Sequence, residues 1–186
     1  MYCDNSLKEY LNDLAAKLAS PGGGSAAALT AALGASLVSM VVNFTLGKPK
    51  YAAFQDMLKK TLEKSENLRT EFLRLVDLDV QAYSSKNIRD ALDIPLMVAR
   101  LCFEGIKLCP PLVIAGNVNL ISDVAVAAAL LEAAFTSASF NVAINLKSLQ
   151  DKKLTRRIEK ELQQKERIIK ETRIATEVEV GKIIRG

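Results

Sequence analysis

The sequence predicts an all-α protein, a helical bundle that forms a single domain over residues 1–186. Three observations lead to this fold class. Apolar residues recur at spacings of three and four along most of the chain, as on one face of a helix. Two long segments are apolar on every side, which is typical of buried helices. The only alternation of apolar and polar residues, at Val178–Val180, is too short to predict a strand.

The first predicted helix covers residues 7–19. Ser6 and Glu9 have the spacing of a capping box, in which each side chain satisfies a free backbone N–H of the first turn. The apolar stripe of this helix is Leu7, Tyr10, Leu11, Leu14 and Leu18. A proline and three glycines follow at residues 21–24, and they predict a break.

The second predicted helix, residues 26–44, is rich in alanine and apolar on every face, with Ser25 as its expected N-cap. Pro49 ends this region, and a long helix is expected over residues 51–85. A further helix is expected to open at Asp93 and Pro95, and Pro110–Pro111 marks the next break or kink.

Turn residues at 116–119 precede a second very apolar helix, expected over residues 123–144 with Ser122 as its cap. The last predicted helix is charged and covers the C-terminal region 152–186, with an apolar stripe that begins at Leu154. Two helices without an exposed polar face are difficult to bury in a domain of 186 residues. We therefore expect a homodimer or a larger homo-oligomer.

The composition excludes several kinds of active site. The chain contains no histidine, which rules out Ser-His and Cys-His nucleophile pairs and every histidine-based metal site. Its three cysteines have no C-x-x-C spacing, and a helix would hold Cys102 and Cys109 about 10 Å apart, too far for a disulfide. We expect no metal, a reducing cytoplasmic location, and an acid or base drawn from Asp, Glu, Lys, Tyr or Cys.

Charge and hydropathy bear on the partners. The net charge of +4 lies entirely within residues 151–186, where the two signs are mixed as on a solvated helix, so we expect no nucleic-acid partner. Residues 18–47 contain no charge and are long enough to span a membrane. Interrupting polar residues and the three glycines favour a soluble core helix, and we expect no membrane partner.

Two segments combine an apolar helix with polar groups at its start. Gly22, Gly23, Gly24 and Ser25 either allow a ligand to approach free backbone N–H groups or form a tight turn between closely packed helices. Asp123 is the only carboxylate between Glu104 and Glu132. It is a candidate general acid or base at a pocket edge, although the helix dipole also favours acidic residues in a first turn.

Other candidates pair residues on one helix face. Asp79 and Tyr83 are four apart, so they form either a polar binding pair or an ordinary surface pair. Asn141 and Asn145 have the same spacing within an apolar helix, where buried amides need partners. Lys48 and Lys147 border these segments and are either solvated charges or contacts for an anionic ligand.

Taken together and in order, these segments resemble a known family. The ordered set runs from PGGGSAAA at residues 21–28 through NFTLGK at 43–48, Asp79 with Tyr83, IPL at 94–96, GN at 116–117 with Asn119, and SDVAVA at 122–127, to NV at 141–142 with INL at 144–146. Over about residues 5–151 the chain is similar to the formiminotetrahydrofolate cyclodeaminase and methenyltetrahydrofolate cyclohydrolase family.

The resemblance implies an all-helical subunit that dimerises, with a folate site near the subunit interface. Its reactions are closure of 5-formiminotetrahydrofolate to 5,10-methenyltetrahydrofolate with loss of ammonia, or hydrolysis of that methenyl ring. The first is the favoured reading and the second the alternative. No cofactor beyond the tetrahydrofolate substrate is expected. A non-catalytic helical dimer that serves as a scaffold is the alternative from another class.

Chemistry and position suggest roles within that implied site. Asp123 is expected to transfer the proton, and Asp79 with Tyr83 to hold the pterin ring. Lys48 or Lys147 is expected to meet the anionic glutamate end of folate. The remaining candidates for substrate binding are the glycine segment Gly22, Gly23, Gly24 and Ser25, together with Asn43, Asn117 and Asn119.

Overall fold

The structure is a computed structural model, which describes residues 1–85, 88–149 and 151–186. Its helices are α1 (Leu7–Ala15), α2 (Gly23–Asn43), α3 (Gln55–Ser85), α4 (Ile88–Ile106), α5 (Cys109–Ala115), α6 (Ile121–Leu146) and α7 (Lys152–Arg185), with short 3-10 helices η1 (Tyr2–Asp4), η2 (Pro49–Phe54) and η3 (Val118–Leu120). The described residues contain no strand, so the predicted all-α fold class is confirmed.

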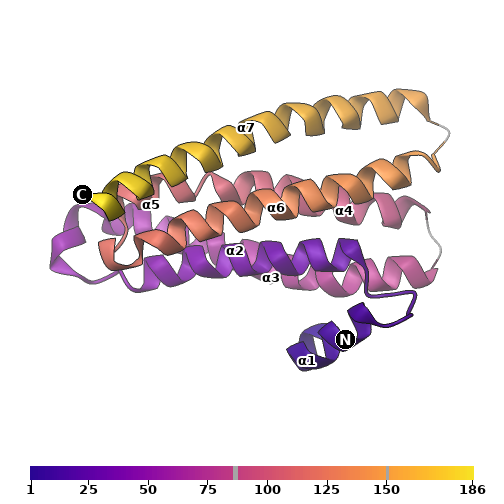
Figure 1. Ribbon diagram of the computed structural model, residues 1–186, viewed down its shortest axis with the longest axis horizontal. Coiled ribbons are helices and arrows are strands. Elements are labelled where there is room, and N and C mark those ends of the chain that lie inside the picture. Colours follow the sequence, from indigo (N-terminus) through magenta and orange to yellow (C-terminus); the bar gives the residue numbers. More distant parts are fainter. Residues whose placement is uncertain (86–87, 150) are drawn as a thin grey trace.

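Five long helices lie side by side along the long axis of the molecule, and α1 lies outside them (Figure 1). Helix α2 packs mainly against α3 and α6, α4 packs against α6, and α7 covers α6. Helices α2 and α6 are antiparallel, because Gly23 lies beside Asn141 while Asn117, just before α6, bonds to Thr45, just after α2. The bundle therefore has two ends, and α2 connects them.

Small residues bring α2 and α6 close together. The buried face of α2 consists mostly of alanine, glycine and serine, and the buried residues of α6 include four alanines. At Gly34 the approach is closest, since a Cβ there would lie 2.9 Å from Cγ of Leu131 and 3.2 Å from the carbonyl oxygen of Ala127. Close-packed interiors leave no room for such an atom. The low aromatic content thus corresponds to a core of closely spaced helices.

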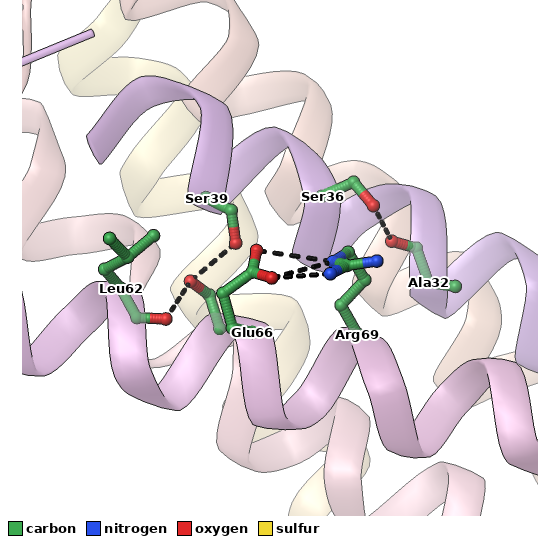
Figure 2. A network of polar contacts seen from close by, with 7 residues as sticks. Ala32, Ser36, Ser39, Leu62, Glu66 and Arg69 are labelled. Atoms are coloured by element: carbon green, nitrogen blue, oxygen red, sulfur yellow. Dashed lines mark hydrogen bonds and ion pairs between the residues drawn. The ribbon is translucent and has the colours of Figure 1, made fainter. Parts of the chain in front are cut away.

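Helices α2 and α3 also share a polar contact. The hydroxyl of Ser39 from α2 lies 2.8 Å from the hydroxyl of Ser65 from α3, and Ser65 donates to the carbonyl oxygen of Leu62. Ser39, Leu62 and the neighbouring Glu66 are labelled in Figure 2. Beside them the Glu66 carboxylate pairs with Arg69 at 2.5 Å, and this pairing lowers the pKa of Glu66. The two buried hydroxyls therefore have partners, as buried polar groups require.

Helix α4 differs from the prediction in an informative way. It begins at Ile88, not near Asp93, and Pro95 lies inside it. A proline has no N–H, so the carbonyl oxygen of Ala91, four residues earlier, loses its helical donor. The side-chain amide of Asn145 in α6 donates to this oxygen at 2.5 Å. A side chain from another helix therefore satisfies the group that makes proline unfavourable within a helix.

Other predicted boundaries were also wrong. Helix α1 ends at Ala15, and its leucines are largely exposed, whereas Tyr10 is buried. Helix α6 begins at Ile121, so Ser122 lies in its first turn and is not its cap. The Ser6 cap is confirmed, since its side chain accepts from the backbone N–H of Glu9.

The charged helix α7 is fixed to the bundle by ion pairs as well as by its apolar stripe. Arg173 pairs with Glu132 of α6 and with Glu177 of its own helix. Arg100 of α4 donates two hydrogen bonds to Glu161 of α7, at 2.9 and 2.7 Å. Ile158 and Ile169 are buried along the same side. The mixed charges of this region thus partly serve helix packing.

By length and composition, two segments of the described chain, Gly23–Asn43 and Val118–Leu146, are apolar enough to cross a membrane. In this structure they pack against each other and are partly buried inside the bundle.

Removing the Asn145 amide should destabilise the fold through the Ala91 carbonyl group. We expect Asn145→Ala to lower the free energy of unfolding by about 1–3 kcal/mol, because a partly buried acceptor loses its donor. In the Pro95→Ala background the backbone supplies an N–H, so the same change should cost less than about 1 kcal/mol. Urea unfolding of the four proteins measures this.

Asn141→Ala is the matched control for that cycle, because its amide donates to the carbonyl oxygen of Ser137 within α6 itself. Equal costs of Asn145→Ala in the two backgrounds would show that the amide does not compensate for the proline.

Candidate functional site

A close contact between a carboxyl group and helical backbone lies where α2 begins. Here Asp79 of α3 projects onto the first turn of α2, at Gly24. A Cβ on Gly24 would lie 2.1 Å from Oδ1 of Asp79 and 2.6 Å from its Cγ. Any other residue would displace the carboxylate. The glycine therefore serves the predicted close packing between helices, and the approach of a ligand to the backbone at this position stays a prediction.

Two further helices complete this region. Asn141 of α6 lies on the other side of α2, where a Cβ on Gly23 would be 3.5 Å from its Nδ2. Tyr10 of α1 is 4% exposed, and its hydroxyl lies 3.1 Å from Oγ of the buried Ser25. We refer to these residues as the glycine-end cluster, which consists of Tyr10, Gly23, Gly24, Ser25, Asp79 and Asn141.

Burial sets the protonation of this cluster. Desolvation raises the pKa of Asp79, and a hydrogen bond from the backbone of Ser25 opposes it. The first-turn N–H groups of α2 and the positive end of the helix also favour a negative charge here. Burial is the larger effect, so the carboxyl group holds its proton to higher pH than a solvated aspartate. Burial likewise raises the pKa of Tyr10, and the Asp79 charge adds to this.

The N-terminal segment is attached beside the cluster by Asp77, which precedes Asp79 by two residues and so lies on a different side of α3. The Asp77 carboxylate is buried and accepts from the backbone N–H groups of Tyr2 at 2.6 Å and Cys3 at 3.4 Å. The Tyr2 ring meets the Tyr10 ring edge to face, with centroids 5.3 Å apart. These contacts hold Tyr10 over the start of α2.

A second group of predicted residues lies where α2 ends. Asn117 is buried, its backbone N–H donates to Thr45 Oγ1 at 2.9 Å, and its side-chain oxygen accepts from the N–H of Asn119. The Val118 N–H donates to the hydroxyl of Tyr51. We refer to the predicted residues at this end as the asparagine-end cluster, which consists of Asn43, Lys48, Asn117, Asn119 and Asp123. Asp123 lies in the first turn of α6, half-buried.

The predicted site residues therefore fall into two groups in a single chain. Helix α2 has 21 residues, which separates the clusters by about 30 Å at 1.5 Å per residue. Asp79 and Asp123 belong to different groups. Lys147 ends α6 at the glycine end, and Lys48 follows α2 at the other, and both are exposed.

Three local predictions need correction. Helix α2 starts at Gly23 with Gly22 as its N-cap, so Ser25 lies inside the helix and is not its cap. The predicted break at residues 21–24 does not include Gly23 and Gly24, which lie inside α2. The packing of Asp79 and Asn141 against these glycines offsets the helix cost of about 1 kcal/mol for each glycine. Tyr83 is 61% exposed, whereas Asp79 points into the bundle, so their shared spacing does not give them a shared environment.

Sequence reasoning assigned Tyr10 to an apolar stripe and gave it no part in the site. The signal that could have found it is its hydroxyl, the single polar group among the leucines of that stripe. A buried tyrosine hydroxyl needs a partner, and Ser25 supplies one.

Comparisons with known proteins identify relatives of the chain. A family model described as formiminotransferase-cyclodeaminase matches residues 6–87 and 84–164. The methenyltetrahydrofolate cyclohydrolase of Methylorubrum extorquens is 37% identical over 183 residues, covering 86% of this chain and 88% of that protein. The formimidoyltransferase-cyclodeaminase of Mus musculus is 30% identical over 171 residues, covering 80% of this chain and 32% of that protein. This chain thus spans about a third of that longer relative.

The fold has a close counterpart among solved structures. The crystal structure of formiminotetrahydrofolate cyclodeaminase from Thermotoga maritima matches with a TM-score of 0.91 at 28% identity. The match covers 96% of this chain and 97% of that one, so the two share the whole bundle.

A side chain at Gly24 should disrupt the cluster. We expect Gly24→Ala to lower the free energy of unfolding by about 1–3 kcal/mol, because the new methyl group overlaps the Asp79 carboxylate. Gly23→Ala is the matched control. Its methyl group would make ordinary contacts with Asn141 at 3.5 Å, so stability should stay within about 1 kcal/mol of wild type. Chemical denaturation measures both, and equal effects of the two changes would contradict the geometry.

The raised pKa of Asp79 should appear in the pH dependence of stability. A carboxyl group with a higher pKa in the folded state binds more protons when folded, so its contribution to stability falls as pH rises through the interval between the unfolded and folded values. Asp79→Asn removes this titration. Above about pH 4 the variant should become progressively more stable relative to wild type. A stability difference independent of pH from 4 to 8 would argue against the raised pKa.

Proposed function

The chain belongs to the formiminotransferase-cyclodeaminase family, and from this premise we propose that it is an enzyme acting on one-carbon derivatives of tetrahydrofolate. The favoured reaction is cyclodeaminase chemistry, in which 5-formiminotetrahydrofolate becomes 5,10-methenyltetrahydrofolate and ammonia leaves. The names of the Thermotoga maritima and mouse relatives support this reaction. The observation that carries the proposal in this chain is the half-buried Asp79 carboxyl group, which lies against Gly24.

The chemistry requires an acid at the departing nitrogen. N10 attacks the formimino carbon and forms a bond to it, which gives a tetrahedral carbon between N5 and N10. The C–N bond to the former imino nitrogen then breaks. Besides the proton released from N10, one further proton must reach this nitrogen for it to leave as ammonia. A positioned general acid with a pKa near the working pH supplies such a proton efficiently.

Asp79 has the properties of that acid. Its burial raises its pKa, so a larger fraction is protonated at neutral pH than for a solvated aspartate. Once it has lost the proton, the Ser25 N–H and the positive end of α2 stabilise the carboxylate. The same group is therefore suited to both protonation states. The hydroxyl groups of Tyr10 and Ser25 are hydrogen-bonded to each other beside this carboxyl group.

Asp123 remains a predicted proton carrier, and the asparagine-end cluster remains a predicted binding region. Since about 30 Å of α2 separates Asp79 from Asp123, one chain does not bring them to the same substrate. We propose that a second copy does. A homodimer with a two-fold axis perpendicular to α2 would place the glycine end of one copy beside the asparagine end of the other.

The surface of α2 and α6 favours such a pairing. Both helices carry large apolar side chains that stay exposed in the single chain, including Leu33 (53%), Phe140 (73%) and Ile144 (59%). Large apolar side chains exposed on neighbouring helices are typical of an interaction surface. In this arrangement Lys48 of a second copy would supply positive charge near the glycine end, for the carboxylates of the folate glutamate.

Cyclohydrolase activity is the second candidate, and one observation favours it. The Methylorubrum extorquens relative, a methenyltetrahydrofolate cyclohydrolase, aligns along 88% of its own length with this chain. Hydrolysis of the methenyl ring passes through a tetrahedral carbon at the same position and needs a base to activate water. A deprotonated Asp79 or Asp123 would serve there. Neither reaction calls for a cofactor beyond the folate.

Two assays decide between the reactions and test the residues. We expect enzyme-dependent ammonia release from 5-formiminotetrahydrofolate, or loss of the methenyl absorbance of 5,10-methenyltetrahydrofolate above the spontaneous rate. Asp79→Asn should reduce kcat by about 100-fold or more, and Asp123→Asn by more than about tenfold. Asp56→Asn, an exposed change on α3, is the control and should retain wild-type rates.

Absence of both activities in the folded protein would favour the scaffold alternative over an enzyme. A wild-type rate for folded Asp79→Asn would remove Asp79 from the mechanism.

A further inference from the structure

A groove with a volume of about 850 Å³ lies between one face of α3 and the end of α4 with the start of α5. Its size falls in the range of small-molecule sites. Its apolar lining includes Leu68 from α3 and Leu101 and Leu108 from the facing segment. Its charged lining includes Lys60, Lys64 and Lys107. We refer to it as the lysine groove.

The floor of the groove is part of the packed bundle. Leu68 lies against Gly105 of α4, where a Cβ would be 3.5 Å from its Cδ1. The same glycine position faces Leu131 of α6, at 3.2 Å. The apolar surface that Leu68 offers to the groove is therefore held by the core, and the site is formed before any ligand binds.

The charges around the groove are unbalanced. Its two carboxylates already have partners, since Glu71 pairs with Arg74 at 2.6 Å and Glu104 pairs with Lys107 at 2.7 Å. Lys60 and Lys64 have no ion pair within the described parts of the chain, and they are four residues apart on one helix face, where like charges repel. An anion between them would relieve this repulsion.

We propose that the lysine groove binds a small amphipathic anion. Its apolar body would cover Leu68, Leu101 and Leu108, and its carboxylate or sulfonate would lie between Lys60 and Lys64. The apolar floor and the uncompensated positive pair select for this class together, because a simple inorganic anion gains nothing from the leucines and a neutral apolar molecule gains nothing from the lysines. None of the lining residues belongs to the glycine-end or asparagine-end cluster. The groove is therefore a second site, independent of the folate proposal.

Titration with the fluorescent anion 8-anilinonaphthalene-1-sulfonate tests this inference in the full-length protein. The chain has no tryptophan, so the fluorescence of the probe is read against a low background. We expect saturable binding with one site per chain. The double change Lys60→Gln and Lys64→Gln should weaken it roughly fivefold or more, as the loss of two ion pairs predicts, and so should 0.5 M salt. Inorganic sulfate at the same ionic strength should compete no better than chloride.

The matched control changes two lysines outside the groove, Lys59→Gln and Lys170→Gln, and should leave the affinity unaltered. Leu101→Ala separates the apolar contribution from the charge contribution. This change should weaken the binding of the probe without changing the salt dependence of that binding. Wild-type affinity in the Lys60 and Lys64 double variant would overturn the site, as would failure of the wild-type protein to bind.

Discussion

The structure depends on the close approach of α2 to its two neighbours. Gly34 lets α2 meet α6 at Leu131, and Gly24 lets it meet the Asp79 carboxylate of α3. The second contact places a carboxyl group against helical backbone and shields it partly from water. Burying the charged form of a carboxyl group in this way costs free energy, and this cost raises the pKa of Asp79. The same packing that stabilises the bundle therefore creates the carboxyl group that we propose as the proton donor.

The length of α2 decides how a site can be assembled. Because this helix runs the length of the bundle, the residues that follow it cannot reach the residues that precede it (Figure 1). A substrate that needs both clusters must lie between two copies of the chain. The exposed apolar residues of α2 and α6 provide a surface for that association. In this proposal one feature leads to both dimerisation and catalysis. The chain does not cover all the apolar side chains of α2, so a second copy covers them and brings the two clusters together.

Much of the fold was predictable from residue spacing, because the long helices carry strong apolar periodicity and the breaks carry proline and glycine. The site was predictable only as a set of residues. Asp79 and Gly24 were both chosen, but no spacing shows that they touch, since 55 positions separate them. The start of α4 was predicted wrongly for a related reason. Pro95 is tolerated inside this helix because Asn145 from another helix donates to the carbonyl group that the proline leaves without a donor. Tyr10 was missed because an isolated aromatic in a leucine stripe has the pattern of a core residue.

Subunit complementation tests the shared site most directly. Asp79→Asn and Asp123→Asn chains, each nearly inactive alone, are mixed, unfolded and refolded together. If each site takes Asp79 from one copy and Asp123 from the other, half the dimers are mixed and each mixed dimer has one intact site. The account predicts recovery of about a quarter of wild-type activity at equal total protein. No recovery, in a mixture shown to contain mixed dimers, would mean that both residues act within one chain and would contradict the shared site.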